Sequence, residues 1–348
     1  MTSALDRKLV VVTGKGGVGK TTLATALALL AASRGLRTIV VEVTGAGTDA
    51  AAAGRLAALL GHPEPPPHGV ELELGERLWG LSIDRDRVLA EWLRALGGRV
   101  PARVLTSSAS FQYLLAAAPG AREMMSMVKV WELAEGRRPD GGEGRYDIVV
   151  LDAPATGHAL GMLRAPKMFS AVARVGPIAR QARQVQDLLG DPGRSAYIAV
   201  TQAGEMAVTE TLELRASLRD ELDRELDAVV VNGALPRRFS GADLNRIAPS
   251  AAMAAPASEI PAPAKIRGAV EIPTPGEIPA PTPSSHPVAH SARRAARAVH
   301  ERVRLQQSQI ARLRRGGVPV VTVPFAFQAE LDLAALRRIA ERLKRGGL

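Results

Sequence analysis

Residues 9–35 read LVVVTGKGGVGKTTLATALALLAASRG, and the fold of the chain can be worked out from this segment. A short apolar run rich in β-branched residues leads into a loop that contains four glycines and two lysines. A segment rich in alanine and leucine follows at once, with Leu23, Leu27 and Leu30 at helical spacing. The pattern predicts a buried parallel strand, a glycine-rich loop and a helix in direct succession.

The loop GKGGVGKT, residues 14–21, fits the phosphate-loop pattern G-x-x-x-x-G-K-[ST] between a strand and a helix. Glycines let successive backbone N–H groups point at phosphate oxygens, and the start of the helix adds its positive dipole end. We expect Lys20 to reach the β- and γ-phosphates and the Thr21 hydroxyl to ligate Mg²⁺. The loop therefore predicts a site for ATP and Mg²⁺. Its expected nucleotide contacts are Gly14, Lys15, Gly16, Gly17, Val18, Gly19, Lys20, Thr21 and Thr22.

Further apolar strands alternate with helices along the chain. Strand-like runs occupy residues 35–43, 146–154, 195–202, 227–235 and 318–325, and RLWGLSIDRDRVLAEWL, residues 77–93, predicts a further short strand followed by a helix. Alternation of this kind is typical of a parallel sheet with helices on both faces. We therefore expect an α/β fold, a doubly wound and mainly parallel sheet of the P-loop NTPase type with a helical subdomain insertion.

The composition divides the chain into five predicted segments. An ATPase core is expected over residues 1–87, 141–245 and 288–348, with a helical subdomain over 88–140. Residues 246–287 are mostly Pro, Ala, Ser and Glu, with near-repeats of EIPxP. Such a composition cannot bury a core, so this segment is predicted to be a flexible insertion.

Composition also excludes several kinds of site. The 348 residues include no cysteine, which rules out disulfides, thiolate zinc sites and a cysteine nucleophile. The formal charge of +10 suits an anionic partner, but aromatic residues make up only 3%, which argues against nucleic-acid binding. The N-terminus lacks the shape of a signal peptide and no uncharged apolar run approaches the ~20 residues of a membrane span. We expect a cytoplasmic protein.

Lys15 is the more specific feature of the loop. With this second lysine, GKGGVGKT resembles the deviant Walker A motif of the dimeric ATPase class that includes ParA, MinD, the nitrogenase iron protein and ArsA-type ATPases. The resemblance implies that Lys15 reaches across a dimer interface to the partner's nucleotide. A positive charge supplied there stabilises the charge that develops during phosphoryl transfer. The implied partner is a second copy of the chain or a paralogue.

A strand-end segment points to one branch of that class. Residues 146–163 read YDIVVLDAPATGHALGML. The part DAPATGH resembles the switch segment of the ArsA and tail-anchored-protein-targeting ATPases, which implies that Asp152 holds Mg²⁺ through water. His158 is either a packed histidine or a catalytic one. The resemblance covers most of residues 8–245 and 288–345.

Two further segments resemble the same family. VVVNGAL matches its strand that ends in asparagine, which implies that Asn232 contacts adenine. An ordinary strand-end turn is the alternative for this residue. VPFAFQAE resembles the proline-containing loop on the other side of the base, so Pro324 and Phe325 are candidates there.

One departure from the family concerns the attacking water. Thr44 stands where the family has an aspartate that orients or activates this water, and a threonine cannot act as a carboxylate base. Glu42 or Asp49 could substitute, and Asp49 joins Lys15, Lys20 and Asp152 as a candidate catalytic residue. We therefore expect slow ATP hydrolysis, or hydrolysis that needs a partner. Without cysteine, the family's dimer-zinc and arsenite thiolate sites are not expected.

The helical region offers a candidate surface for a client. Methionines can line a groove for an apolar helix, but the same spacing also fits a plain helical core. The residues concerned are Leu114, Leu115, Met124, Met125, Met127, Val128, Val130 and Trp131. The last helix, over about 329–347, is basic and amphipathic, so it either touches a membrane or covers the sheet.

The function implied is that of a dimeric, Mg²⁺-dependent ATPase. Closure driven by nucleotide would control a protein client or a membrane partner. The alternatives are a ParA/MinD-like positioning ATPase and a hydrolysis-poor ATP-binding regulatory subunit.

Overall fold

The computed structural model describes residues 3–44, 54–62, 69–91 without 86 and 90, 120–136, 146–172, 176–246, and 286–348 without 329. The chain divides into two compact units, Met1–Leu235 with Gln306–Leu348, and Pro236–Leu305. Asp49, Leu114 and Leu115 lie outside the described residues, as does most of the predicted insertion.

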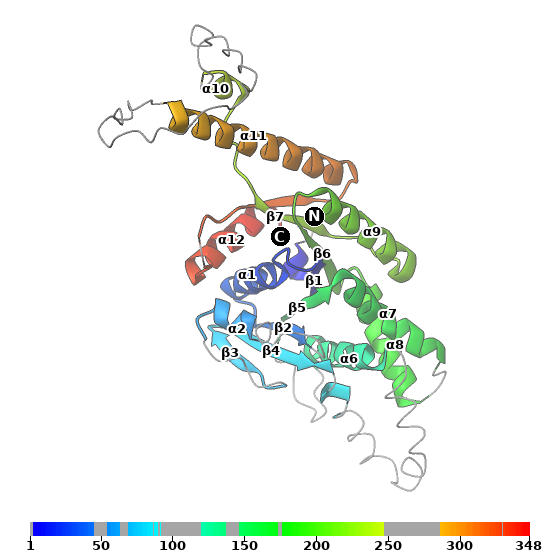
Figure 1. The fold of residues 1–348 in the computed structure, drawn as a ribbon. Coiled ribbons are helices and arrows are strands. Elements are labelled where there is room, and N and C mark those ends of the chain that lie inside the picture. The colour runs from blue at the N-terminus through cyan, green and yellow to red at the C-terminus, as the bar shows by residue number, and fades with distance from the viewer. Residues whose placement is uncertain are drawn as a thin grey trace, which may run out of the picture. The chain divides into compact units, whose positions relative to one another are not determined.

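The first unit is built on a sheet of eight strands in the order β3-β4-β2-β5-β1-β6-β7-β8. Every neighbouring pair is parallel except β3 and β4, which are antiparallel. The predicted α/β fold with a mainly parallel sheet is confirmed (Figure 1). The strands are β1 Leu9–Gly14, β2 Thr38–Thr44, β3 Leu72–Gly75, β4 Leu78–Asp84, β5 Ile148–Ala155, β6 Ser195–Thr201, β7 Ala228–Ala234 and β8 Val320–Pro324.

Helices cover both faces of the sheet, and the strands alternate between two cores accordingly (Figure 1). Leu9 and Val11 of β1 belong to one core, whereas Val10 and Val12 belong to the other, as the two-residue period of a strand requires. The first core contains α6 Ala121–Glu135, α7 Thr156–Val172, α8 Pro177–Gly190 and α9 Glu205–Leu222. The second contains the 3₁₀ turn η1 Ala4–Asp6, α1 Lys20–Ser33, α2 Arg55–Leu59 and α12 Leu333–Arg345.

The parallel register brings the functional strand ends together. Asp152 of β5 is the register partner of Val12 on one side and of Glu42 on the other. The loop that follows β1 therefore begins beside Asp152 of the neighbouring β5, and Glu42 lies one strand further along, on β2. This edge of the sheet, at the carboxyl ends of its parallel strands, is where ligands bind in folds of this type.

The methionine-rich helix is α6, and its apolar side chains belong to the core. Met124, Met125 and Met127 are at most 2% exposed and pack in the same cluster as α7 and α8. Val130 and Trp131 are buried there too. The plain-core alternative therefore describes these residues, and they line no exposed groove.

Helix α12 covers the sheet. Its side chains Ala335, Leu336, Ala340 and Leu343 are buried against the protein, whereas Leu333 at its start is 37% exposed. The helix packs beside α1 (Figure 1). No helix among the described residues is both long enough and apolar enough to span a membrane.

The second unit contains α10 Gly241–Arg246 and the first part of α11, which runs over His286–Arg315. Within it, a ring nitrogen of His300 lies 3.0 Å from the Phe239 carbonyl oxygen. The second unit thus begins at Pro236 and ends at Leu305, whereas the composition predicts an insertion over residues 246–287. Helix α11 crosses the second of these boundaries without a break.

Gly14→Ala is expected to lower the free energy of unfolding by roughly 2–4 kcal/mol. The new methyl group would lie 2.1 Å from the Val200 carbonyl oxygen, and the residue would have to keep a φ of 146°. Gly16→Ala is the matched control, because a Cβ there has no neighbour within 4 Å. Urea denaturation of the nucleotide-free proteins measures both, and equal stability of the two variants would contradict the close approach of β1 to β6.

Candidate functional site

The glycine loop wraps tightly against the end of β7. Gly19, which precedes α1, has a φ of 94°, and a Cβ on it would lie 2.3 Å from Nδ2 of Asn232. That amide nitrogen donates a hydrogen bond to the Val18 carbonyl oxygen over 2.8 Å. Only glycine fits this position, because it has neither the Cβ nor the penalty for a left-handed backbone.

The two residues that open α1 meet the carboxylate at the end of β5. The Thr21 hydroxyl donates to Oδ2 of Asp152 over 2.6 Å. Oδ1 of Asp152 is buried and has no hydrogen-bond partner. Lys20 Nζ donates to the Lys15 carbonyl oxygen over 3.1 Å, inside the curve of the loop. The structure thus brings together the two predicted metal-binding residues and the predicted phosphate-binding lysine.

Burial perturbs the charged groups of this site. It raises the pKa of Asp152 to about 6, against the hydrogen bond from Thr21 and the charge of Lys20, which lower it. Burial and the neighbouring Asp152 charge raise the pKa of Glu42 to about 7. Burial also lowers the pKa of Lys20, although Asp152 opposes the change. Groups shifted in this way gather at functional sites.

The donor set suits Mg²⁺. A threonine hydroxyl and a carboxylate with one unsatisfied oxygen are the hard oxygen ligands that this ion prefers. In phosphate-binding sites, Mg²⁺ uses one or two carboxylates together with waters and phosphates. Among the described residues there is no cluster of three or more His, Asp or Glu that would hold a metal by protein ligands alone.

Lys15 forms an ion pair within its own chain. Its Nζ lies 2.5 Å from Oε1 of Glu210 on α9, and both side chains are about one-third exposed, at 39% and 33%. Sequence spacing gives no indication of this pair, since the two residues lie 195 positions apart. A trans role for Lys15 therefore requires this ion pair to open.

The residues predicted for the base lie close to the loop. Pro324 is the register partner of Ala234 at the end of β7, and the Phe325 backbone N–H donates to the Ala234 carbonyl oxygen over 3.0 Å. A Cβ on Gly233 would lie 3.6 Å from the Phe325 ring. Asn232 itself uses its amide to hold the phosphate loop, a contact that the sequence did not predict.

The residues considered for the role of the missing switch aspartate differ in burial and in hydrogen bonding. The Thr44 hydroxyl is buried and donates to the Ile83 carbonyl oxygen of β4 over 3.2 Å. Glu42 lies beside Asp152 and accepts a 3.4 Å hydrogen bond from the Gly54 N–H. Asp49 lies outside the described residues, and His158 is exposed at the start of α7.

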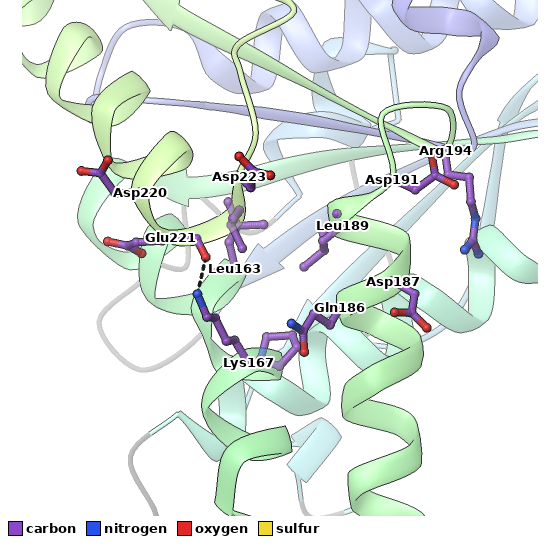
Figure 2. Close-up of a pocket in the computed structure, with 13 residues that line it drawn as sticks. Leu163, Lys167, Gln186, Asp187, Leu189, Asp191, Arg194, Asp220, Glu221 and Asp223 are labelled. Carbon is purple, nitrogen blue, oxygen red and sulfur yellow. Dashed lines mark hydrogen bonds between the residues drawn. The ribbon is translucent and has the colours of Figure 1, made fainter.

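Away from the phosphate loop, a cavity of about 570 Å³ lies where α8 and α9 end against α7 (Figure 2). Lys167 donates to the Glu221 carbonyl oxygen across it over 3.0 Å. Arg194 and Asp223, which also line it, come before β6 and β7, so the cavity belongs to the edge of the sheet opposite the phosphate loop. None of the predicted site residues lines it.

Glu42→Gln is expected to stabilise the nucleotide-free protein near pH 8 by on the order of 1–3 kcal/mol. Because the pKa of Glu42 is raised by folding, the native state binds more protons than the unfolded state between about pH 4.5 and pH 7. The free energy of unfolding of the wild type should therefore fall as pH rises through this window, and that of the variant should fall less. Near pH 5 the two proteins should be nearly equal.

Urea denaturation in the presence of a metal chelator measures this effect. Glu213→Gln, on the exposed face of α9, is the control and should follow the wild type at both pH values. A variant no more stable than the wild type near pH 8 would mean that Glu42 is not buried beside Asp152.

Known proteins match the chain across this site. The family model of the anion-transporting ATPases matches residues 7–182. The ATPase BagA of Mycobacterium tuberculosis is 30% identical over 253 residues, which is 69% of this chain and 69% of that protein. A putative arsenical pump-driving ATPase of Halobacterium salinarum is 29% identical over 248 residues, 65% of this chain and 35% of that protein.

A plant protein matches over a similar length. The ATPase GET3C of Arabidopsis thaliana is 26% identical over 281 residues, 69% of this chain and 70% of that protein. The family model covers about half of the chain and includes both the phosphate loop and the segment that contains Asp152. The chain therefore belongs to the ArsA family of anion-transporting ATPases.

Proposed function

We propose that this member of an ATPase family is a cytosolic, Mg²⁺-dependent ATPase that works as a dimer. Its nucleotide state would control the binding of a protein client or a membrane partner. The observation that carries the proposal is the 2.6 Å contact of Thr21 with Asp152 at the end of the glycine loop. A P-loop ATPase uses such a pair on its metal ion.

Each loop residue has a distinct role in this proposal. Bound Mg²⁺ would neutralise charge on the β- and γ-phosphates, with Thr21 and Asp152 as the residues that hold it. The loop N–H groups would bind phosphate oxygens, and Lys20 would turn from the Lys15 carbonyl oxygen to the phosphates. The Asn232 side chain supports the loop by its hydrogen bond to the Val18 carbonyl oxygen.

The base would lie beyond Asn232, against Pro324 and Phe325. Both residues are exposed where β8 ends, and Phe325 is 48% exposed. An exposed aromatic ring beside Gly233 offers a face on which adenine can stack.

The proposed dimer rests on the role of Lys15. Its pair with Glu210 is partly exposed, and such pairs contribute only about 0–1 kcal/mol. The lysine could therefore leave Glu210 at little cost when a partner's phosphates approach. The name arsenical pump-driving ATPase of one relative supports control of a membrane partner, and the buried methionines of α6 mean that a client surface would have to form elsewhere or by opening.

A hydrolysis-poor ATP-binding regulatory subunit is the second candidate. The observation that favours it is the Thr44 hydroxyl, which is buried and bonded to Ile83 rather than directed to a water. The ParA/MinD-like alternative is weaker, because the apolar face of α12 is buried against the protein.

Lys20→Ala is expected to weaken ATP binding about 100-fold, because a buried charge on the phosphates is lost. Calorimetric titration with ATP measures the affinity, and circular dichroism checks the fold. Lys344→Ala, an exposed lysine on α12, is the control. Unchanged affinity and turnover in the Lys20 variant would exclude the phosphate-loop assignment.

Lys15→Ala is expected to reduce turnover roughly 10³-fold while ATP affinity changes little, because the lysine acts on the partner's nucleotide. Steady-state phosphate release measured over a range of protein concentrations tests this, since turnover per subunit should fall on dilution. Glu210→Gln is the matched control, because it opens the same ion pair but keeps the lysine, and it should retain turnover. Turnover that does not depend on protein concentration well below the dimer dissociation constant would contradict the trans role.

Thr44→Asp is expected to raise basal turnover about tenfold or more if the loop follows the family path, because the new carboxylate would then turn from the Ile83 carbonyl oxygen and orient water. Asp49→Ala, measured in parallel, separates the two candidate positions. If Asp49→Ala abolishes turnover while Thr44→Asp has no effect, Asp49 is the functional carboxylate and the alignment of this loop is wrong.

A further inference from the structure

A groove of about 830 Å³ lies between the segment after β8 and one side of α12. Its lining combines aromatic and aliphatic side chains with a row of arginines, and it is referred to below as the Phe–Arg groove. The apolar residues are Val323, Pro324, Phe325, Ala326, Phe327, Ala335 and Ile339. The charged residues are Arg337, Arg338, Glu341, Arg342 and Arg345.

Two phenylalanines make this groove unusual. Phe325 is 48% exposed and Phe327 is 60% exposed, and their rings meet edge to face with centroids 5.0 Å apart. The whole chain has five phenylalanines, so a pair exposed side by side is a marked concentration. Exposed apolar patches of this kind typically mark an interaction site.

The charges of the groove are unbalanced. Four guanidinium groups line it against the single carboxylate of Glu341. Within the described part of the chain, no carboxylate lies at ion-pair distance from any of the four arginines. Arg338 donates to the Gln328 side chain over 3.2 Å, and Arg342 donates to the Thr322 carbonyl oxygen over 2.9 Å. These hydrogen bonds orient the two guanidinium groups but leave their positive charges unneutralised for a ligand.

None of residues 14–22 lines the groove, although Pro324 and Phe325 belong both to its lining and to the proposed base site. Phe327 and the arginines have no part in the proposed ATPase function. A lipid bilayer fits this surface poorly, since the surface is concave and most apolar side chains of α12, including Leu336 and Leu343, are buried in the protein. A peptide segment with both negative charge and apolar side chains matches the lining better.

We propose that the Phe–Arg groove binds an acidic segment of a partner protein in which Asp or Glu stands next to aromatic or branched apolar side chains. The apolar side chains pack against the two phenylalanines, and the carboxylates accept paired hydrogen bonds from the guanidinium groups. Aromatic and arginine side chains in a concave setting are the ones that contribute most to such binding. This goes beyond the proposed ATPase function and does not depend on it.

The test selects ligands from a phage-displayed library of random dodecapeptides on the full chain. Counter-selection uses a variant with Arg338→Ala and Arg345→Ala. Enriched peptides should combine acidic with aromatic or branched apolar residues, and their fluorescein-labelled forms should bind the wild type measurably by anisotropy. Phe327→Ser and the double arginine variant should each weaken binding about tenfold, and added salt should weaken it further.

Matched controls separate the groove from general surface effects. Arg180→Ala on α8 and Met206→Ser, whose side chain is 71% exposed, should leave peptide affinity unchanged. Enriched peptides without acidic residues, or equal affinity for the wild type and the groove variants, would overturn the proposal. If polyglutamate binds as tightly as the selected peptides, apolar side chains are not needed for binding, and the proposal is overturned in favour of general charge attraction. Binding of phosphatidylglycerol vesicles that depends on Phe327, with no peptide enriched, would overturn it in favour of a membrane.

Discussion

Burial of charge at the carboxyl ends of the central strands is the constraint on which the candidate site depends. Asp152 and Glu42 are register partners on neighbouring strands, and both are nearly inaccessible to water. Burial raises the pKa of both carboxyl groups, and the Asp152 charge raises the pKa of Glu42 further. Thr21 and Lys20 offset part of the rise for Asp152, but one oxygen of Asp152 stays unsatisfied. This unsatisfied oxygen supports the proposal that the site binds a cation.

Local pattern was enough to predict the central part of the fold. The phosphate loop could be predicted because its glycines, its lysine and the flanking strand and helix are consecutive in the chain. Strand β3 was missed, since it has four residues, alternates with exposed glutamate and exists only by antiparallel pairing with β4. Helix α7 was not predicted, because Gly161 and Pro166 interrupt its helical pattern, and α8 was not predicted either. The methionines of α6 show another limit, since the same spacing fits a buried face and an exposed groove.

In the site, the contacts that could not be predicted join distant parts of the chain. Residue type and spacing indicate Lys15, Lys20, Thr21 and Asp152, but nothing local indicates Glu210 or the bond of Asn232 to Val18. The Asn232 hydrogen bond fixes the loop that should bind phosphate, and Glu210 holds the lysine that should act across a dimer. The Lys15–Glu210 ion pair is partly exposed, and the proposed dimer would have to open it. The Phe–Arg groove begins at the same end of the sheet, with Pro324 and Phe325 shared between its lining and the proposed base site.

The central claim is that Thr21 and Asp152 form the metal-binding part of a nucleotide site. The most direct measurement is calorimetric titration of ATP with and without Mg²⁺, for the wild type and Asp152→Asn. If Thr21 and Asp152 hold the ion, Mg²⁺ should strengthen ATP binding to the wild type about tenfold or more. In the variant the affinity without Mg²⁺ should be similar or higher, because a negative charge near the phosphates is gone, while the gain from Mg²⁺ should largely disappear. A gain from Mg²⁺ that is equal in both proteins would contradict the account.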